Sequence, residues 1–348
     1  MKPLYNQNKQ HASEILNVLL QNDKENRLIL GSLNGIDILL RVASVSNLNV
    51  FYFFTNTVFQ STQYYKKHDP ASEDEEEFMA NVFNCICSAV QSCDMNRELF
   101  YKGEGLELMN LILKEKRQKD SKTDVRLFAF KVLNHSLSTE NPDELLAKSS
   151  DKFVEILGLR VLMPVFQKPS SILGQKKKKK NQSTLNEVEE HSVSVILTLL
   201  RFCKPENLAR VLNKFVELNM VKTERLVEMY LKYSEEMISL DDELREQGIH
   251  PDNDPENEEL FANRMRGGTL FTLQLICHII LLLSTQEEPK GQIGSKMFTI
   301  KERILKLLNM HKHAEVNHVD YIRQTVIDYA KEKNENEAVE LSELVNMF

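Results

Sequence analysis

The sequence has no tryptophan, and glycine and proline are scarce, with eleven and nine in 348 residues. A protein built of many short strands needs frequent turns, and turns rely on glycine and proline. Their scarcity argues against an all-β fold and favours long helices. Long apolar runs are also missing, since Thr272, Gln274 and His278 interrupt the longest one, Leu270 to Leu283. This run is too short to span a bilayer, so we predict a buried helix and no membrane association.

The cysteines and the first ten residues indicate in which cellular compartment the protein is expected. Residues 1–10 are polar and lack an apolar stretch behind a basic head, so the sequence shows no cleavable signal pattern. The cysteines are odd in number, which predicts free thiols in a reducing compartment: Cys85, Cys87, Cys93, Cys203 and Cys277. Cys85 and Cys87 are two apart and would point to different faces of a helix, and no second pair has zinc-site spacing. We predict no metal and no cofactor.

The net charge of −7, from 44 basic and 51 acidic side chains, disfavours direct binding to a nucleic acid backbone. The lysine run Lys176 to Lys180 is a local exception. By composition it lies in a solvated loop, and the functional alternatives are a nuclear-import signal or an RNA-contacting loop.

Motifs for catalysis are missing as well. The glycines of Gly103-Glu104-Gly105 lack the strand-turn-helix setting of a phosphate-binding loop. The acidic clusters Glu73 to Glu77 and Asp252 to Glu259 are expected in loops, where nothing would hold two carboxylates in an acid/base geometry. We therefore predict a protein that is not an enzyme, with a helical enzyme as a disfavoured alternative.

What the sequence does contain is a repeat. Ile15 to Leu40 and Val82 to Glu115 share a plan of an apolar helix, a polar corner, a short helix and a glycine that opens a second apolar run. The corners Asn26-Arg27 and Asn96-Arg97 are 70 residues apart, and the same spacing separates Gly35 from Gly105. A weaker third copy is Phe153 to Phe166, with Gly158 in the place of Gly105. Such self-similarity predicts an all-α solenoid of stacked helical units.

This plan resembles the armadillo repeat. Six blocks, in order along nearly the whole chain, resemble the beta-catenin-like protein 1 family of spliceosome-associated nuclear proteins: Lys102 to Arg117, Lys152 to Phe166, Val211 to Glu217, Leu226 to Tyr233, Asp252 to Met265 and Phe271 to Ile279. The resemblance implies a non-catalytic nuclear scaffold in pre-mRNA splicing, associated with the nineteen complex. Its implied partners are basic, localisation-type segments of splicing factors, including a Myb-type core subunit of that complex. An importin-alpha-like adaptor is the alternative, but its groove needs Trp-Asn pairs.

We predict a single armadillo-like α-solenoid over residues 1–348, which the resemblance identifies as the carboxy-terminal part of a longer family domain. Flexible or inserted segments are expected at four places: near 44–77, 169–187, 241–259 and 285–298. Within the first, residues 47–60 are either a genuine extension or an error in the sequence.

Residues on the third helix of each repeat are the candidate peptide contacts. In peptide-binding armadillo proteins an asparagine there hydrogen-bonds the peptide backbone, and Asn17 and Asn134 resemble it, with Ser88 at the equivalent place in the second copy. Four apolar residues at helical spacing are expected in the core: Leu108, Leu111, Leu157 and Ile276.

Overall fold

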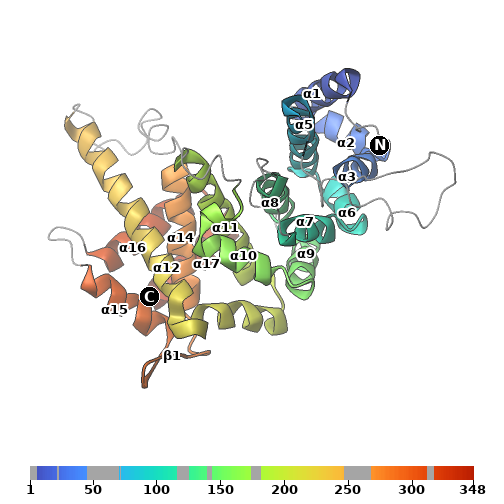
Figure 1. The fold of residues 1–348 in the computed structure, drawn as a ribbon. Coiled ribbons are helices and arrows are strands. Elements are labelled where there is room, and N and C mark those ends of the chain that lie inside the picture. The colour runs from blue at the N-terminus through green and yellow to red at the C-terminus, as the bar shows by residue number, and fades with distance from the viewer. Residues whose placement is uncertain are drawn as a thin grey trace. The chain divides into compact units, whose positions relative to one another are not determined.

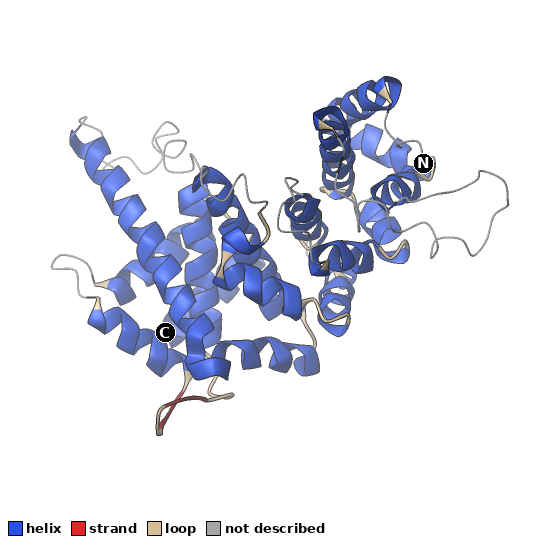
Figure 2. Cartoon of the chain, in the orientation of Figure 1, coloured by secondary structure: helices blue, strands red, loops and turns tan. Residues whose placement is uncertain are grey.

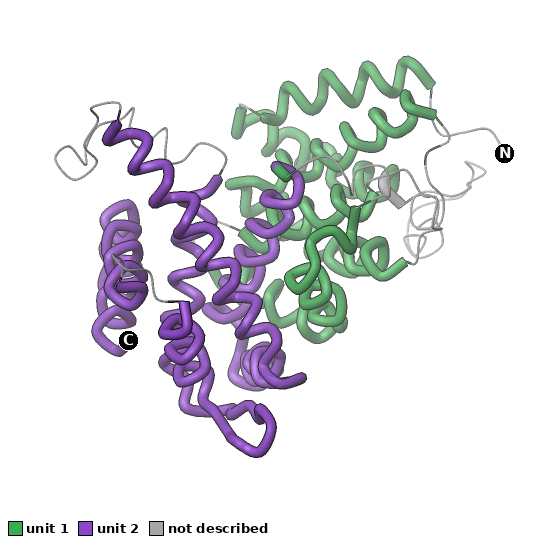
Figure 3. The backbone as a smooth tube through the Cα atoms, turned by 60° about the vertical axis from the view of Figure 1, so that its left-hand side comes forward, with its two compact units in different colours: residues 1–182 green, residues 183–348 purple. Residues whose placement is uncertain are grey.

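The computed structural model describes residues 6–21, 23–44, 70, 72–115, 125–138, 143–173, 182–246, 268–311 and 317–348. The chain divides into two compact units, residues 1–182 and 183–348 (Figure 3). Helices dominate both units, and the strands in the described part form one small hairpin (Figures 1 and 2). The predicted all-α class is therefore confirmed. Residues 47–60, 176–180 and 252–259 lie outside the described residues.

Unit 1 is built from helices that follow one another in sets of three. The sets are α1 (Gln7–Gln21), α2 (Lys24–Ser32) and α3 (Gly35–Ser44); α5 (Glu73–Val90), α6 (Asp94–Lys102) and α7 (Gly105–Lys114); and α8 (Val125–Ser136), α9 (Glu144–Glu155) and α10 (Leu159–Gln167), followed by the 3₁₀ turn η1 (Pro169–Ser171). The first helices of the sets pack in order, α1 on α5 and α5 on α8 (Figure 1). We call the three sets the first, second and third repeat.

The three repeats share one turn between their second and third helices. A single non-glycine residue with left-handed backbone precedes the third helix each time: Asn34 (φ 57°), Glu104 (φ 58°) and Leu157 (φ 64°). The main-chain hydrogen bonds of this turn recur as well, from Asn34 N to Gly31 O, from Glu104 N to Tyr101 O and from Leu157 N to Val154 O. The third copy predicted from the sequence is thus a structural repeat.

The glycine after this turn is required by close packing. A Cβ atom on Gly105 would lie 2.5 Å from the Phe100 ring, and one on Gly158 would lie 2.3 Å from the Phe153 ring. Both phenylalanines are fully buried. The aromatic ring five residues before the glycine therefore occupies the space that any other side chain would need.

The polar corners hold neighbouring helices together through main-chain carbonyls. Asn96 is buried and its Nδ2 donates 2.8 Å hydrogen bonds to Ala89 O and to Arg27 O of the preceding repeat. Arg27 is buried too, and its guanidinium donates to Leu20 O, Gln21 O and Gln91 O at 2.7 to 2.8 Å. A cation is favourable at these sites because helix carboxyl ends carry unsatisfied carbonyls.

Two of the four predicted core residues are buried and two are not. Leu108 and Ile276 are buried, in unit 1 and unit 2 respectively, whereas Leu111 and Leu157 are each 40% exposed. Leu157 is exposed because it occupies the left-handed apex of the turn before α10. Leu111 is exposed because α7 turns its other apolar residues, including Ile112, toward the core. The prediction was wrong for Leu111 and Leu157.

Unit 2 contains longer helices and the hairpin. Its elements are α11 (Gln182–Phe202), α12 (Pro205–Glu246), α14 (Thr269–Ser284), β1 (Gly291–Ile293), β2 (Lys296–Phe298), α15 (Ile300–Met310), α16 (His318–Lys331) and α17 (Glu335–Met347). The strands are antiparallel, with Gly291 opposite Phe298. The hairpin lies in 285–298, which we expected to be flexible or inserted. The apolar run that follows Gly268 forms α14 and is buried, as predicted.

A break divides α12 into two helical parts. Leu218, Asn219 and Met220 have left-handed backbone (φ 53°, 57° and 62°), and Glu217 before them is extended. The Thr223 hydroxyl donates to Phe215 O across the break at 2.8 Å. The second part continues to Glu246, so residues 241–246 are helical although we expected residues 241–259 to be flexible or inserted.

Candidate functional site

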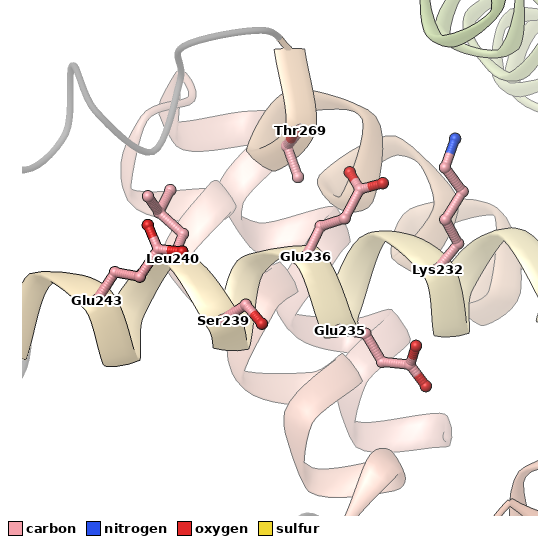
Figure 4. Close-up of a pocket in the computed structure, with 7 residues that line it drawn as sticks. All are labelled: Lys232, Glu235, Glu236, Ser239, Leu240, Glu243 and Thr269. Atoms are coloured by element: carbon pink, nitrogen blue, oxygen red, sulfur yellow. The ribbon is translucent and has the colours of Figure 1, made fainter. Parts of the chain in front are cut away.

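The candidate site is a groove of about 680 Å³ in unit 2, which runs along α12 beside the first turn of α14. Its lining residues are Lys232, Glu235, Glu236, Ser239, Leu240, Glu243 and Thr269 (Figure 4). All but Thr269 come from successive turns of the second part of α12. Because residues four apart on a helix share a face, Glu235, Ser239 and Glu243 follow one line along the groove.

The charges of this groove are unbalanced. Glu235, Glu236 and Glu243 make no ion pair with the described residues. Lys232 is the cation of the lining, but its Nζ lies 2.7 Å from both Glu189 Oε2 and Asn186 Oδ1. Even with Lys232 counted, three carboxylates against one ammonium group give the lining of the groove a net negative charge. We call these three residues the groove glutamates.

A buried carboxylate fixes α12 against α11 behind the groove. Glu189 of α11 accepts hydrogen bonds from Arg225 at 2.6 Å, from Lys232 at 2.7 Å and from the Tyr233 hydroxyl at 2.9 Å. Burial and the Glu189 carboxylate both raise the pKa of Tyr233, so this hydroxyl stays a donor. With three donors on one carboxylate, the groove side of α12 is held in place.

A second carboxylate of α11, that of Glu190, lies beside Gly268, the residue that precedes α14. A Cβ atom on Gly268 would be 2.5 Å from Glu190 Oε2, and Gly268 has left-handed backbone (φ 76°), so glycine is favoured here for two reasons. Burial, and to a smaller extent the nearby Glu187 carboxylate, together raise the pKa of Glu190 from 4.5 to about 6. The folded protein therefore holds the proton of Glu190 more tightly than the unfolded chain does.

We expect the substitution Glu190→Gln to stabilise the protein above pH 6 and to remove part of its pH dependence. Because the folded pKa of Glu190 is raised, its contribution to stability is fully present below pH 4.5 and is lost as the pH rises through 6. Glutamine mimics the protonated form at every pH. Urea unfolding of wild type and variant across this range measures the difference, with the exposed Glu243→Gln as control. A variant less stable than wild type above pH 6 would contradict the assignment.

The candidate peptide contacts lie in unit 1, away from the groove along the chain. Asn17 is on α1, Ser88 on α5 and Asn134 on α8. These are the first helices of the three repeats as defined above, and not the third helices expected from the sequence. Ser88 is buried and the two asparagines are half-buried. Asn17 Oδ1 has no hydrogen-bond partner among the described residues. That these residues contact a peptide stays a prediction.

The groove glutamates were not predicted from the sequence, because the denser acidic clusters at 73–77 and 252–259 were considered instead. The structure corrects the first cluster: Glu73 to Glu77 form the first turns of α5 and not a loop. The cause is Ser72, whose hydroxyl caps the helix by accepting from Glu75 N, with acidic side chains favourable at that end. The recurrence of Glu235, Ser239 and Glu243 every four residues was the available signal for the groove.

The described residues were compared with the requirements of a metal site and of a reactive thiol. No group of His, Cys, Asp and Glu among them could hold a metal ion. Of the cysteines, only Cys203 is not fully buried, and burial raises the pKa of Cys85 to about 12 and also raises that of Cys277. Such thiols are poor nucleophiles. None of the described helices is long and apolar enough to cross a membrane.

Three-helix repeats, with a left-handed turn and a glycine where each third helix starts, define unit 1 as an armadillo-type helical-repeat structure. The model of the family of catenin-beta-like, Arm-motif-containing nuclear proteins matches residues 2–49 and 52–324. The chain belongs to this family, which is nuclear.

Curated relatives agree with this family. Beta-catenin-like protein 1 from Homo sapiens is 34% identical over 347 residues, which cover 97% of this chain and 53% of the relative. The mouse protein matches to the same extent. The homolog from Schizosaccharomyces pombe is 30% identical over 315 residues, with 88% of this chain and 48% of the relative covered. The chain thus spans about half the length of the curated relatives it matches.

Proposed function

We propose that this protein is a non-catalytic scaffold in pre-mRNA splicing that binds lysine- and arginine-rich segments of splicing factors. Membership of a nuclear armadillo-motif family supports the scaffold and its nuclear setting. The observation that carries the choice of ligand is the groove along α12, because its three glutamates form no ion pair with any of the residues that the structure describes. Among the partners we include a Myb-type core subunit of the nineteen complex, on the strength of the sequence resemblance.

The groove suits a basic segment for electrostatic reasons. Open carboxylates accept charge-assisted hydrogen bonds from lysine and arginine, and these are stronger than neutral ones. Glu235, Glu236 and Glu243 extend over more than two helical turns, so a bound segment would meet several carboxylates at once. Leu240 adds an apolar contact for the stem of a long basic side chain. Attraction of this kind acts mainly on the association rate and weakens as salt screens it.

We expect a lysine- and arginine-rich peptide to bind the full chain, with an affinity that falls as salt is raised. Changing the groove glutamates together, Glu235→Gln, Glu236→Gln and Glu243→Gln, should weaken binding about tenfold, since exposed ion pairs contribute roughly 0.2 to 1 kcal/mol each. Titration calorimetry at low and high salt measures both effects.

The matched control carries Glu25→Gln, Glu98→Gln and Glu104→Gln, which remove the same charge from unit 1. If the control loses as much affinity as the groove variant, the net charge and not the groove binds the peptide. A separate variant, Asn134→Ala, tests the surface of unit 1 and should cost about 1 kcal/mol if its amide holds the peptide backbone. A peptide affinity that does not change with salt concentration, or no binding at all, would contradict the electrostatic proposal.

The splicing role is tested independently by affinity capture from nuclear extract with the full chain as bait. Recovery of splicing factors that depends on the groove glutamates supports the proposal. Recovery of transport factors would favour the importin-type adaptor, and recovery of neither would remove the splicing assignment.

A further inference from the structure

Two positive side chains of unit 1 lie near each other without a negative partner. Lys114 is in the last turn of α7 and Arg160 in the first turn of α10, and α7 contacts α10. Both side chains belong to exposed residues. With the residues that the structure describes, Arg160 makes no ion pair and no side-chain hydrogen bond, and Lys114 makes one hydrogen bond and no ion pair. We call these two residues the cation pair.

The turn between α9 and α10 brings the cation pair together. Lys114 Nζ donates to Ile156 O at 3.0 Å, and Asn110 Nδ2 donates to the same carbonyl at 2.8 Å. Ile156 precedes Arg160 by four residues. Burial lowers the pKa of Lys114, and the positive charge of Arg160 lowers it further, so the two charges are close enough to repel each other.

The first and second repeats differ from the third at the place of Arg160. Two residues after the glycine at the start of each third helix are Asp37, Glu107 and Arg160 respectively. Asp37 pairs with Arg41 at 2.7 Å, and Glu107 pairs with Lys152 at 2.8 Å. In these two repeats an acidic residue neutralises a nearby cation, whereas the third repeat has a second cation there. The positive charge of the cation pair is therefore not compensated within the described part of unit 1.

An exposed leucine lies beside each member of the cation pair. Leu111 precedes Lys114 by three residues, so both lie on one face of α7. Leu157 precedes Arg160 by three residues, and Arg160 N donates to Leu157 O at 3.1 Å. Each leucine is 40% exposed. The same surface thus offers free hydrogen-bond donors and apolar contacts.

We propose that the cation pair is a binding site for an acidic protein segment that also carries large aliphatic residues. A carboxylate at the site would accept hydrogen bonds from the free guanidinium of Arg160 and from the ammonium hydrogens of Lys114 that are not donated to Ile156 O. Leu111 and Leu157 would contact the aliphatic side chains of the segment.

A nucleic acid is the less favourable ligand for this surface. Nucleic acid binding relies on cations that neutralise several phosphates at once, and the chain has a net charge of −7. Exposed leucines contribute nothing to phosphate binding. The site also differs from the groove of unit 2, which is negatively charged, so the two proposals do not depend on each other.

The test uses the full chain and a short fluorescent peptide composed of Asp, Glu and Leu. We expect the peptide to bind, measured by fluorescence anisotropy, with an affinity that falls as salt is raised. Lys114→Gln with Arg160→Gln should weaken binding about tenfold, the effect of losing two exposed ion pairs. Leu111→Ala should weaken it about threefold through lost apolar burial. Lys114→Arg with Arg160→Lys keeps both charges and should retain most of the affinity.

The matched control is Lys24→Gln with Arg41→Gln, which removes one lysine and one arginine from the first repeat and should leave the affinity unchanged. Changing the groove glutamates to glutamine should also leave it unchanged. Circular dichroism checks that each variant is folded.

Three results would overturn the proposal. The first is no binding of the acidic peptide, or equal binding of a peptide with Asn and Gln in place of Asp and Glu. The second is an equal loss of affinity in the control variant, which would attribute binding to net charge. The third is displacement of the peptide by oligouridylate that itself binds through Lys114 and Arg160, which would assign the site to a nucleic acid.

Discussion

Replacing Phe153 with alanine is expected to destabilise unit 1 by about 3 to 5 kcal/mol, because the ring is fully buried and its loss leaves a cavity. The ring packs directly on Gly158 at the turn before α10. Urea unfolding, followed by circular dichroism and by amide exchange in unit 1, measures the loss. Leu157→Ala is the matched control, since this neighbouring leucine is 40% exposed, and it should have a much smaller effect.

The contact between Phe153 and Gly158 can be tested more specifically by combining substitutions at the two positions. Gly158→Ala alone should cost about 1 to 3 kcal/mol, because the new methyl group collides with the ring in a packed core. In Phe153→Ala the ring is gone, so adding Gly158→Ala should then cost little. The double variant would be more stable than the sum of the two single effects predicts. Strict additivity would show that the glycine is required for some other reason.

The second large effect is expected at the buried guanidinium of Arg27. Arg27→Met keeps much of the side-chain volume but removes the donors to Leu20 O, Gln21 O and Gln91 O. Hydrogen bonds from a charged donor contribute roughly 1.5 to 3 kcal/mol each, and some of the freed carbonyls will find water, so we expect a loss of about 2 to 4 kcal/mol. Urea unfolding measures it.

Arg41→Met provides the control for Arg27. Arg41 pairs instead with a carboxylate, that of Asp37, at 2.7 Å. Both side chains are exposed, and such surface pairs contribute little. We expect a change within about 0.5 kcal/mol. Equal losses for the two variants would mean that removal of positive charge, and not the three hydrogen bonds, destabilises unit 1.

The sequence predicted the parts of the fold that depend on local rules. The shared spacing of Asn26-Arg27 and Asn96-Arg97 identified the repeat, and the structure shows why: each asparagine bonds the carbonyl seven residues earlier, Leu19 O or Ala89 O. The glycine positions were equally informative, because packing leaves no space for a side chain there. The asparagine spacing and the glycine positions both depend on contacts within one repeat, so they can be recognised from a single sequence.

Features that depend on contacts between distant segments were not predictable in this way. Leu111 and Leu157 belong to apolar runs, but which residue of a run faces outward is decided by the neighbouring helices and by the turn. The groove depends on α14 lying beside α12, and no local pattern fixes that neighbour. The groove glutamates can be seen in the sequence. Without knowledge that α14 lies beside them, however, their spacing indicates only a solvent-exposed helix face.

The polar contacts between repeats have a consequence for how such a chain can change over evolutionary time. Asn96 and Arg27 reach across to main-chain carbonyls, and these are present whatever side chain the neighbouring repeat carries. A substitution at Gln91, for example, leaves its carbonyl in place for Arg27. Repeats joined in this manner can drift apart in sequence and still stack, provided that the asparagine and the arginine persist.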